Sequence, residues 1–147
     1  MARYMQGRFK PKFPEKYKGN PTNIIYRSSW EFSLMHRFDS DPNVEFWQSE
    51  EIKIPYADPT RNHHGIYHPD FLVKYKEPNH LEMIEVKPKA QTKAPRGTPT
   101  NKRYIKEALT FARNTAKWEA ARRFCAKRGI EFRIITEDHI FKNGRIP

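Results

Sequence analysis

Two acidic residues and one lysine in the middle of the chain have the types and spacing of a metal-dependent hydrolytic site. Asp70 lies in the segment His68-Pro69-Asp70-Phe71, and Glu85 and Lys87 are two residues apart on the next expected strand. Residues two apart on a strand point to the same face, and a hairpin would bring Asp70 opposite Glu85. Two such carboxylates, with the backbone carbonyl of Val86, would hold a hard cation such as Mg²⁺ or Mn²⁺. Lys87 would then position or deprotonate an attacking water, or stabilise negative charge on phosphorus.

A third carboxylate, Glu31, has two interpretations. Leu34, Met35 and Phe38 follow it at helical spacing, so Glu31 shares the apolar face of its helix. A carboxylate there costs free energy unless it is paired or binds a metal. Alternatively, Ser28 and Glu31 form a capping box, in which Glu31 accepts a hydrogen bond from the Ser28 amide. The spacing alone leaves both interpretations open.

The surroundings of Glu85 and Lys87 argue against a simple ion pair on a solvated strand. Met83 shares their face, and Ile84 and Val86 make the opposite face apolar. A strand that is apolar on both faces is expected at the centre of a sheet. Central strands rarely carry an unpaired Glu and Lys without a function.

The elements that must position these residues follow from periodicity and turn signals. We expect helices over residues 28–38 and 102–128, the second ended by Gly129, and loops over 56–65 and 90–101. Strands are expected over residues 44–48, 51–55, 67–75, 81–87 and 130–135. This order predicts one α/β domain, with a mixed central sheet flanked by helices. A basic N-terminal arm (residues 1–22) would precede a domain of residues 23–147. The aromatic residues of the arm would either pin it to the domain or stack on a base.

The charge of the chain predicts a polyanionic partner. The 147 residues carry a formal net charge of +11, and residues 87–106 hold seven basic and no acidic side chains. Such a field attracts nucleic acid. The residues expected to contact DNA are Lys89, Lys93, Arg96, Lys102, Arg103, Lys106, Arg113 and Lys117.

Several other classes of protein are disfavoured. No apolar run is long enough to span a bilayer, and the N-terminus lacks the apolar core of a signal peptide, so no membrane partner is expected. Cys125, the one cysteine, fits a small core residue and a reducing cytoplasm. His63, His64 and His68 suggest a zinc or HNH-type site, but no cysteine lies near them in sequence.

The motif residues resemble those of the PD-(D/E)XK nuclease superfamily. Pro69-Asp70 is followed after fourteen residues by Glu85-Val86-Lys87, with Glu31 upstream in the order that the superfamily shows. The wider pattern, from Arg27-Ser28-Ser29-Trp30-Glu31 to Lys87-Pro88, is similar to the endonuclease subunit of cut-and-paste transposition systems. Over nearly the whole chain, beginning with Met1 to Lys10, the sequence also resembles the head-completion nucleases of contractile-tailed phages.

The resemblance implies a restriction-endonuclease-like fold and a Mg²⁺-dependent deoxyribonuclease, with Glu31, Asp70 and Glu85 as metal ligands and Lys87 assisting. It further implies trimming or sealing of packaged DNA in the host cytoplasm before head–tail joining, with portal or neck proteins as partners and retention in the virion as an open possibility. Superfamily members often add a Gln or Lys from the following helix; Lys117 or Asn114 could fill that place, and Lys117 could equally be a solvated lysine. The alternatives are a non-catalytic virion protein on a nuclease scaffold and a small basic DNA-binding regulator.

Overall fold

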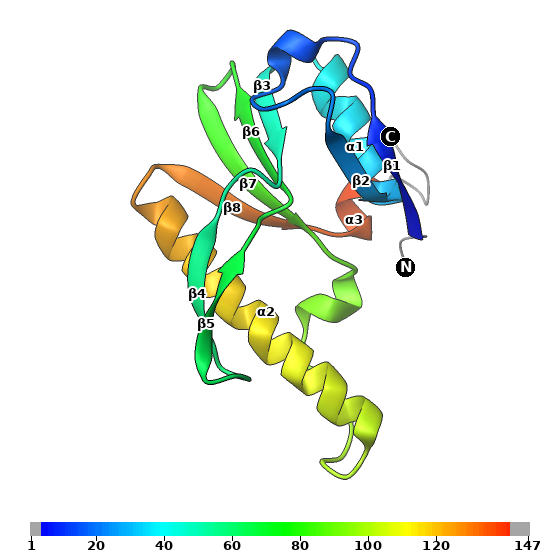
Figure 1. Ribbon diagram of the computed structural model, residues 1–147, viewed down its shortest axis with the longest axis vertical. Coiled ribbons are helices and arrows are strands. Elements are labelled where there is room, and N and C mark those ends of the chain that lie inside the picture. Colours follow the sequence, from blue (N-terminus) through cyan, green and yellow to red (C-terminus); the bar gives the residue numbers. More distant parts are fainter. Residues whose placement is uncertain (1–3, 142–147) are drawn as a thin grey trace.

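The computed structural model describes residues 4–141, which form a mixed sheet with helices packed against it (Figure 1). The strands are β1 (Tyr4–Phe9), β2 (Ile24–Ser28), β3 (Val44–Ser49), β4 (Ile54–Asp58), β5 (His63–Tyr67), β6 (Phe71–Tyr75), β7 (His80–Val86) and β8 (Ile130–Ile135). The helices are η1 (Pro14–Lys16), α1 (Ser29–Ser40), η2 (Lys89–Thr92), α2 (Lys102–Ala126) and α3 (Glu137–Ile140). No helix in residues 4–141 is long and apolar enough to cross a membrane.

The central sheet has the strand order β3-β6-β7-β8. β3, β6 and β7 pair antiparallel, whereas β8 is parallel to β7 because α2 carries the chain back across the sheet. Met83 and Ile84, adjacent on β7, are 0% and 2% exposed and belong to different hydrophobic clusters. The mixed sheet and the central position of this strand, both predicted from the sequence, are confirmed.

α1 begins where the sequence predicted, because the Ser28 side chain accepts a hydrogen bond from the Glu31 amide at 3.1 Å. It ends at Ser40 rather than before Asp39. Asp39 is buried in the last turn, where its carboxylate accepts backbone hydrogen bonds from Lys12 and Phe13 at 2.8 and 3.1 Å. The turn signal at residues 39–42 therefore also ties the N-terminal segment to the helix.

The N-terminal segment is joined to the rest of the chain by strand pairing, which the expectation of an extended arm did not include. It is also joined by burial of aromatic side chains, which was one of the two expected alternatives. β1 pairs antiparallel with β2, and α1 packs against both. Phe9 and Tyr17 are each 6% exposed and contact the buried ring of Trp47 edge-on. These two aromatic residues pin the segment to the core rather than standing ready to stack on a base.

Two expected elements between residues 51 and 75 were wrong. The polar loop predicted at residues 56–65 is mostly a β-hairpin, in which β4 and β5 pair from Ile54 with Tyr67 to Asp58 with His63. Buried Tyr56 and Tyr67 face α2 within one hydrophobic cluster. The segment between these two tyrosines is mostly polar, so the sequence lacks the apolar run that would have indicated strands. The single strand predicted at residues 67–75 is interrupted at residues 68–70, between β5 and β6.

α2 is the longest element, and only its C-terminal half is packed against the sheet (Figure 1). Trp118, Ala121 and Cys125 are at most 4% exposed, which confirms the core position of Cys125. The N-terminal half projects beyond the β4–β5 hairpin, and Ile105 and Leu109 there are more than 40% exposed. α2 therefore contributes to the core through its C-terminal half only.

Candidate active site

Asp70 and Glu85 come together because the β6–β7 hairpin places them at the same end of the sheet. Phe71 pairs with Ile84, so the next residues outward are Asp70 and Glu85. The Val86 amide donates a hydrogen bond to Asp70 Oδ2 at 2.7 Å, which holds the Asp70 carboxylate against β7. The two carboxyl groups are close enough to share a hydrogen bond when one holds a proton. The facing arrangement expected from the sequence is therefore present.

Glu85 is buried at the base of this arrangement, 5% exposed. Its Oε2 accepts a hydrogen bond from the Trp118 indole at 3.4 Å and lies 3.8 Å from Lys87 Nζ. Lys87 is partly exposed, and its amide continues the ladder to Ile135 at 3.0 Å. Lys87 thus presents an ammonium group beside the carboxylates, at the point where β7 leaves the sheet.

The environment of Asp70 disfavours its negative charge. Burial raises the pKa of the Asp70 carboxyl well above its ordinary value, and the nearby carboxylates of Glu85 and Glu31 raise it further. The hydrogen bond from Val86 acts in the opposite direction but is outweighed. Like charges held together in a buried place store free energy that a bound cation would release.

Glu31 contacts the start of its helix and also lies near Asp70, and its role as a metal ligand stays a prediction. Its own amide is capped by Ser28, but its carboxylate accepts from the Arg27 amide at 3.2 Å rather than from the Ser28 amide. The same carboxylate is near enough to Asp70 to raise the Asp70 pKa. Burial raises the pKa of Glu31 as well, and Glu50 adds to the shift. The helix N-terminus therefore brings a third carboxylate to the edge of the Asp70–Glu85 pair.

Glu50 and Arg27 are neighbours of this site to which the sequence assigned no role. Glu50 follows β3 with a left-handed backbone, φ 57°, and its amide donates to the Asp70 carbonyl at 3.2 Å. Its carboxylate pairs with the Arg27 guanidinium at 3.2 Å. Nothing local in the sequence marks Glu50, since its position depends on the turn after β3 and on its contact with Asp70.

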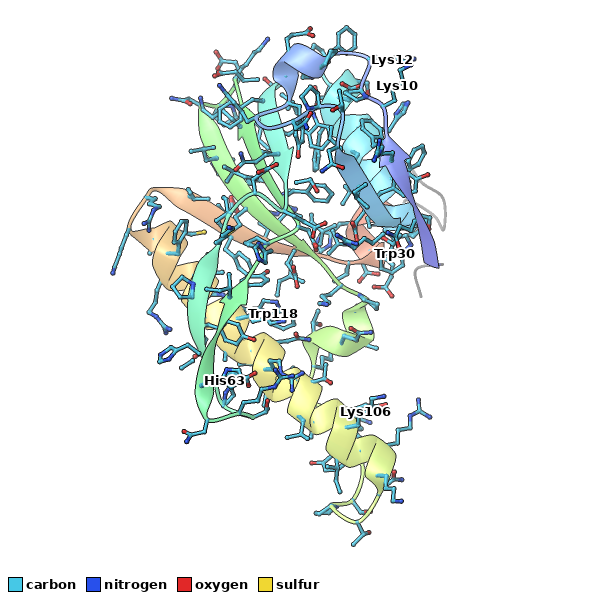
Figure 2. All side chains as sticks on the ribbon, viewed as in Figure 1. Lys10, Lys12, Trp30, His63, Lys106 and Trp118 are labelled. Atoms are coloured by element: carbon cyan, nitrogen blue, oxygen red, sulfur yellow. The ribbon has the colours of Figure 1, made fainter. Side chains whose placement is uncertain are left out.

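Three of the predicted DNA contacts line one groove. The groove has a volume of about 610 Å³ and lies between residues 90–95 and the N-terminal half of α2. Lys93, Arg103 and Lys106 line it together with Asn114 and Glu107, and Glu107 pairs with Arg103 at 2.9 Å. A shallower hollow of about 410 Å³, along Lys102 and Arg113, runs beside it on the same helix. Lys106 stands on the projecting half of α2 (Figure 2).

The remaining predicted DNA contacts have other positions. Lys89 forms an exposed ion pair with Asp138 at 2.9 Å, and Arg113 pairs with buried Asp58 at 3.2 Å, which joins α2 to the β4–β5 hairpin. Arg96 is exposed on the loop before α2. Lys117 is partly buried, with Nζ 5.8 Å from the centre of the Tyr56 ring. Burial lowers the pKa of Lys117, while Glu85 opposes that shift, so this lysine lies beside the carboxylates.

The histidines of the expected loop lie apart from the carboxylates. His63 and His64 are exposed on β5, and His63 Nδ1 lies 2.8 Å from the His64 carbonyl. Figure 2 shows His63 on the β4–β5 hairpin. In the described part of the chain, the group of side chains with the tightest metal-like spacing is elsewhere, where His80 Nε2 lies 3.0 Å from both Glu82 and Glu131. Arg133 also pairs with Glu82 at 3.0 Å, so this group is already joined by ion pairs.

The donor set around Asp70 fits a hard divalent cation. It consists of oxygen atoms, which Mg²⁺ and Mn²⁺ prefer, and its carboxylates repel one another when no cation is bound. The buried Tyr67 hydroxyl beside Glu85 and Asp70 has no hydrogen-bond partner among residues 4–141. Both features mark a place built to receive a further group. The predicted carbonyl ligand, Val86, contributes its amide to Asp70, and its role as a ligand stays a prediction.

Comparison with known proteins agrees with this geometry. Residues 41–137 match the family model described as TnsA-like endonuclease N terminal, a range that includes Asp70, Glu85 and Lys87. The chain is also 38% identical to the head completion nuclease of Enterobacteria phage T4 over 137 residues, which cover 90% of this chain and 91% of that protein. No solved structure matches significantly. The two matches agree with the mixed central sheet and with the buried carboxylate pair beside a lysine. The chain belongs to the TnsA-like endonuclease family.

Proposed function

We propose that this protein hydrolyses DNA phosphodiester bonds with Mg²⁺ or Mn²⁺ at the Asp70–Glu85–Lys87 site, and that it does so during phage head completion. The observation that carries the proposal is the buried Asp70–Glu85 pair, with Lys87 Nζ 3.8 Å from Glu85. The similarity to a head completion nuclease over 90% of the chain supports the biological setting.

The residues divide the work by their positions. Asp70 and Glu85, with Glu31 at the edge, would hold the cation, which when bound would neutralise the scissile phosphate and acidify water. Lys87 would place its positive charge against the phosphate oxygens as negative charge develops on them. Buried Trp118 would hold Glu85 in place through its indole N–H, 3.4 Å from Oε2. Lys117 and Asn114 stay candidates for a further residue from the helix.

Cutting should depend strictly on a divalent cation. Purified protein incubated with closed circular plasmid is expected to nick it in Mg²⁺ or Mn²⁺ and to leave it intact in EDTA, because the carboxylates bind substrate phosphate only through a cation. Gel electrophoresis of the plasmid separates the nicked from the closed form and also shows whether cutting is endonucleolytic. The Asp70→Ala variant, purified in parallel, controls for a contaminating nuclease. Equal cutting with and without EDTA would contradict the proposal.

DNA should follow the groove beside α2. Changing Lys93 and Lys106 to Ala together is expected to weaken DNA binding about tenfold or more at low salt. The slope of log Kd against log salt should fall by about 2, since each lost phosphate contact removes about one unit. Fluorescence anisotropy over a range of salt concentrations measures both quantities.

The matched control for the groove lies at the other end of the same helix. Arg123 and Lys127 are exposed near the C-terminus of α2, outside the groove. Changing both to Ala removes the same charge, and it should lower the affinity slightly without reducing the salt slope by 2. Equal losses in the two double variants would show that net charge, rather than the groove, determines binding.

The setting in the host cytoplasm, with portal or neck proteins as partners and possible retention in the particle, is part of the proposal. The alternative, a non-catalytic head protein on a nuclease scaffold, predicts that a cleavage-dead variant still completes heads. Complementation of a phage lacking this protein with the Asp70→Ala variant separates the two. Restored infectious particles would favour the alternative, and unstable or non-infectious heads would favour the nuclease.

A further inference from the structure

The Tyr67 hydroxyl is a buried polar group without a partner at the centre of the site. Tyr67 is the last residue of β5, 4% exposed, and packs in one hydrophobic cluster with Met83 and Trp118. Its ring lies 6.0 Å below Lys117 Nζ. Its hydroxyl is close enough to the Glu85 carboxylate to interact with it, yet within residues 4–141 it makes no hydrogen bond of full geometry.

Such a hydroxyl costs the folded protein free energy. A buried group that loses its hydrogen bonds to water and gains none in return is destabilising, whereas a phenyl ring of the same shape would not be. A tyrosine hydroxyl carries its proton at neutral pH. Toward the carboxylates of Glu85 and Asp70, which accept hydrogen bonds, the Tyr67 hydroxyl acts as the donor.

Glu85 is the acceptor that lacks a firm donor. Its bond from the Trp118 indole is long, at 3.4 Å, and Lys87 Nζ stands at 3.8 Å. Trp118 donates to Glu85 from α2, and the Tyr67 hydroxyl lies near the same carboxylate at the end of β5. The two aromatic residues therefore approach the carboxylate from different elements. A small movement of the Glu85 side chain would let both groups donate to it.

We infer that Tyr67 and Trp118 are positioning residues that orient the Glu85 carboxylate when a divalent cation binds, an inference that rests on the proposed function. Donors behind a metal ligand fix its orientation, and losing one typically weakens metal binding or activity about 10–100-fold. In this view the Tyr67 hydroxyl donates a full hydrogen bond to Glu85 only when a cation is bound, which explains why that bond is missing in the cation-free protein.

The test is Tyr67→Phe, which removes the hydroxyl and keeps the ring. The cation-free variant should melt at the same temperature as the wild type or slightly higher, because no hydrogen bond is lost. Its Kd for Mn²⁺, followed by the electron paramagnetic resonance signal of free Mn²⁺, should rise about tenfold. Its kcat for plasmid nicking should fall while KM for DNA stays unchanged. Tyr75→Phe, the same change at the far end of β6, should alter neither Mn²⁺ binding nor nicking.

Each other outcome is decisive. A Tyr67→Phe melting temperature several degrees below that of the wild type would show that the hydroxyl is structural, and unchanged Mn²⁺ binding would show that it does not position Glu85. Trp118→Phe, which lacks the indole N–H, should also bind Mn²⁺ more weakly and, unlike Tyr67→Phe, melt lower because it leaves a cavity. Asp70→Ala separates the two proposals: if it too leaves Mn²⁺ binding unchanged, the proposed site itself is wrong.

Discussion

Replacing Asp70 with Asn should abolish DNA cutting and, in the same protein, raise the stability of the cation-free fold. Asp70 is held among Glu85 and Glu31, and burial together with these two charges raises its pKa well above the ordinary value. In the wild type the Val86 amide donates a hydrogen bond to Asp70 Oδ2 at 2.7 Å. An Asn removes the charge but keeps an oxygen that can accept this hydrogen bond. The substitution therefore removes a repulsion and a metal ligand together.

The expected sizes of the two effects differ. Nicking of plasmid in Mg²⁺ should fall below detection, since a neutral amide is a poor ligand for a hard cation. The melting temperature in EDTA should rise by about 2–4 °C, which for a domain of this length corresponds to about 1 kcal/mol. Differential scanning calorimetry in EDTA and in excess Mg²⁺ measures both states. Added Mg²⁺ should stabilise the wild type more than the variant.

The pH dependence of this gain provides the control. A carboxyl whose pKa is raised by folding binds its proton more tightly in the folded state, so it loses stability as pH rises through the raised value. Below the ordinary carboxyl pKa, Asp70 is protonated in both states, and Asn should offer no advantage. The gain should therefore be absent in acid and grow as the pH rises from the ordinary carboxyl pKa toward the raised one. A variant that is less stable than the wild type at neutral pH in EDTA would contradict this account.

Replacing Lys87 with Met should slow cutting about 10²–10⁴-fold and leave cation binding intact. The Lys87 ammonium stands 3.8 Å from Glu85 Oε2, beside the proposed cation site. A protonated amine has no lone pair to give to a metal, so Lys87 would act on the phosphate and not as a ligand. Removing one group that transfers a proton or stabilises the transition state typically costs this much in kcat. Met has a similar length and keeps the packing of the aliphatic stem. Single-turnover cleavage at saturating Mg²⁺ measures the rate.

The Lys87 and Asp70 variants should fail for different reasons. The Kd for Mn²⁺ should be the same in Lys87→Met as in the wild type or lower, because a nearby positive charge is gone, whereas Asp70→Asn should bind Mn²⁺ much more weakly. Lys74→Met is the matched control: Lys74 also pairs with a glutamate, Glu45 on the neighbouring strand β3, at 3.5 Å. If the Lys74 and Lys87 variants cut at equal rates, Lys87 has no catalytic role.

The sequence alone determined the strands and helices whose patterning is local. The apolar alternation on both faces around Glu85 placed β7 at the centre of the sheet, and the serine cap placed the start of α1. The facing of Asp70 and Glu85 followed from strand geometry and a short turn. The β4–β5 hairpin could not be predicted in this way, because its apolar face is covered by α2, a helix that begins 35 residues later.

Only the tertiary structure decided how the site is completed. Glu31 lies on a different element from the motif strands, and its approach to Asp70 depends on how α1 packs across the sheet. Glu50 reaches the site through a left-handed turn. Tyr67, which precedes Glu85 in the sequence, and Trp118, which follows it, both lie beside the Glu85 carboxylate. Spacing along a sequence reports which residues share one helix or strand face. Contacts between separate elements depend on packing, and here packing sets the charge environment on which the chemistry of Asp70 and Glu85 depends.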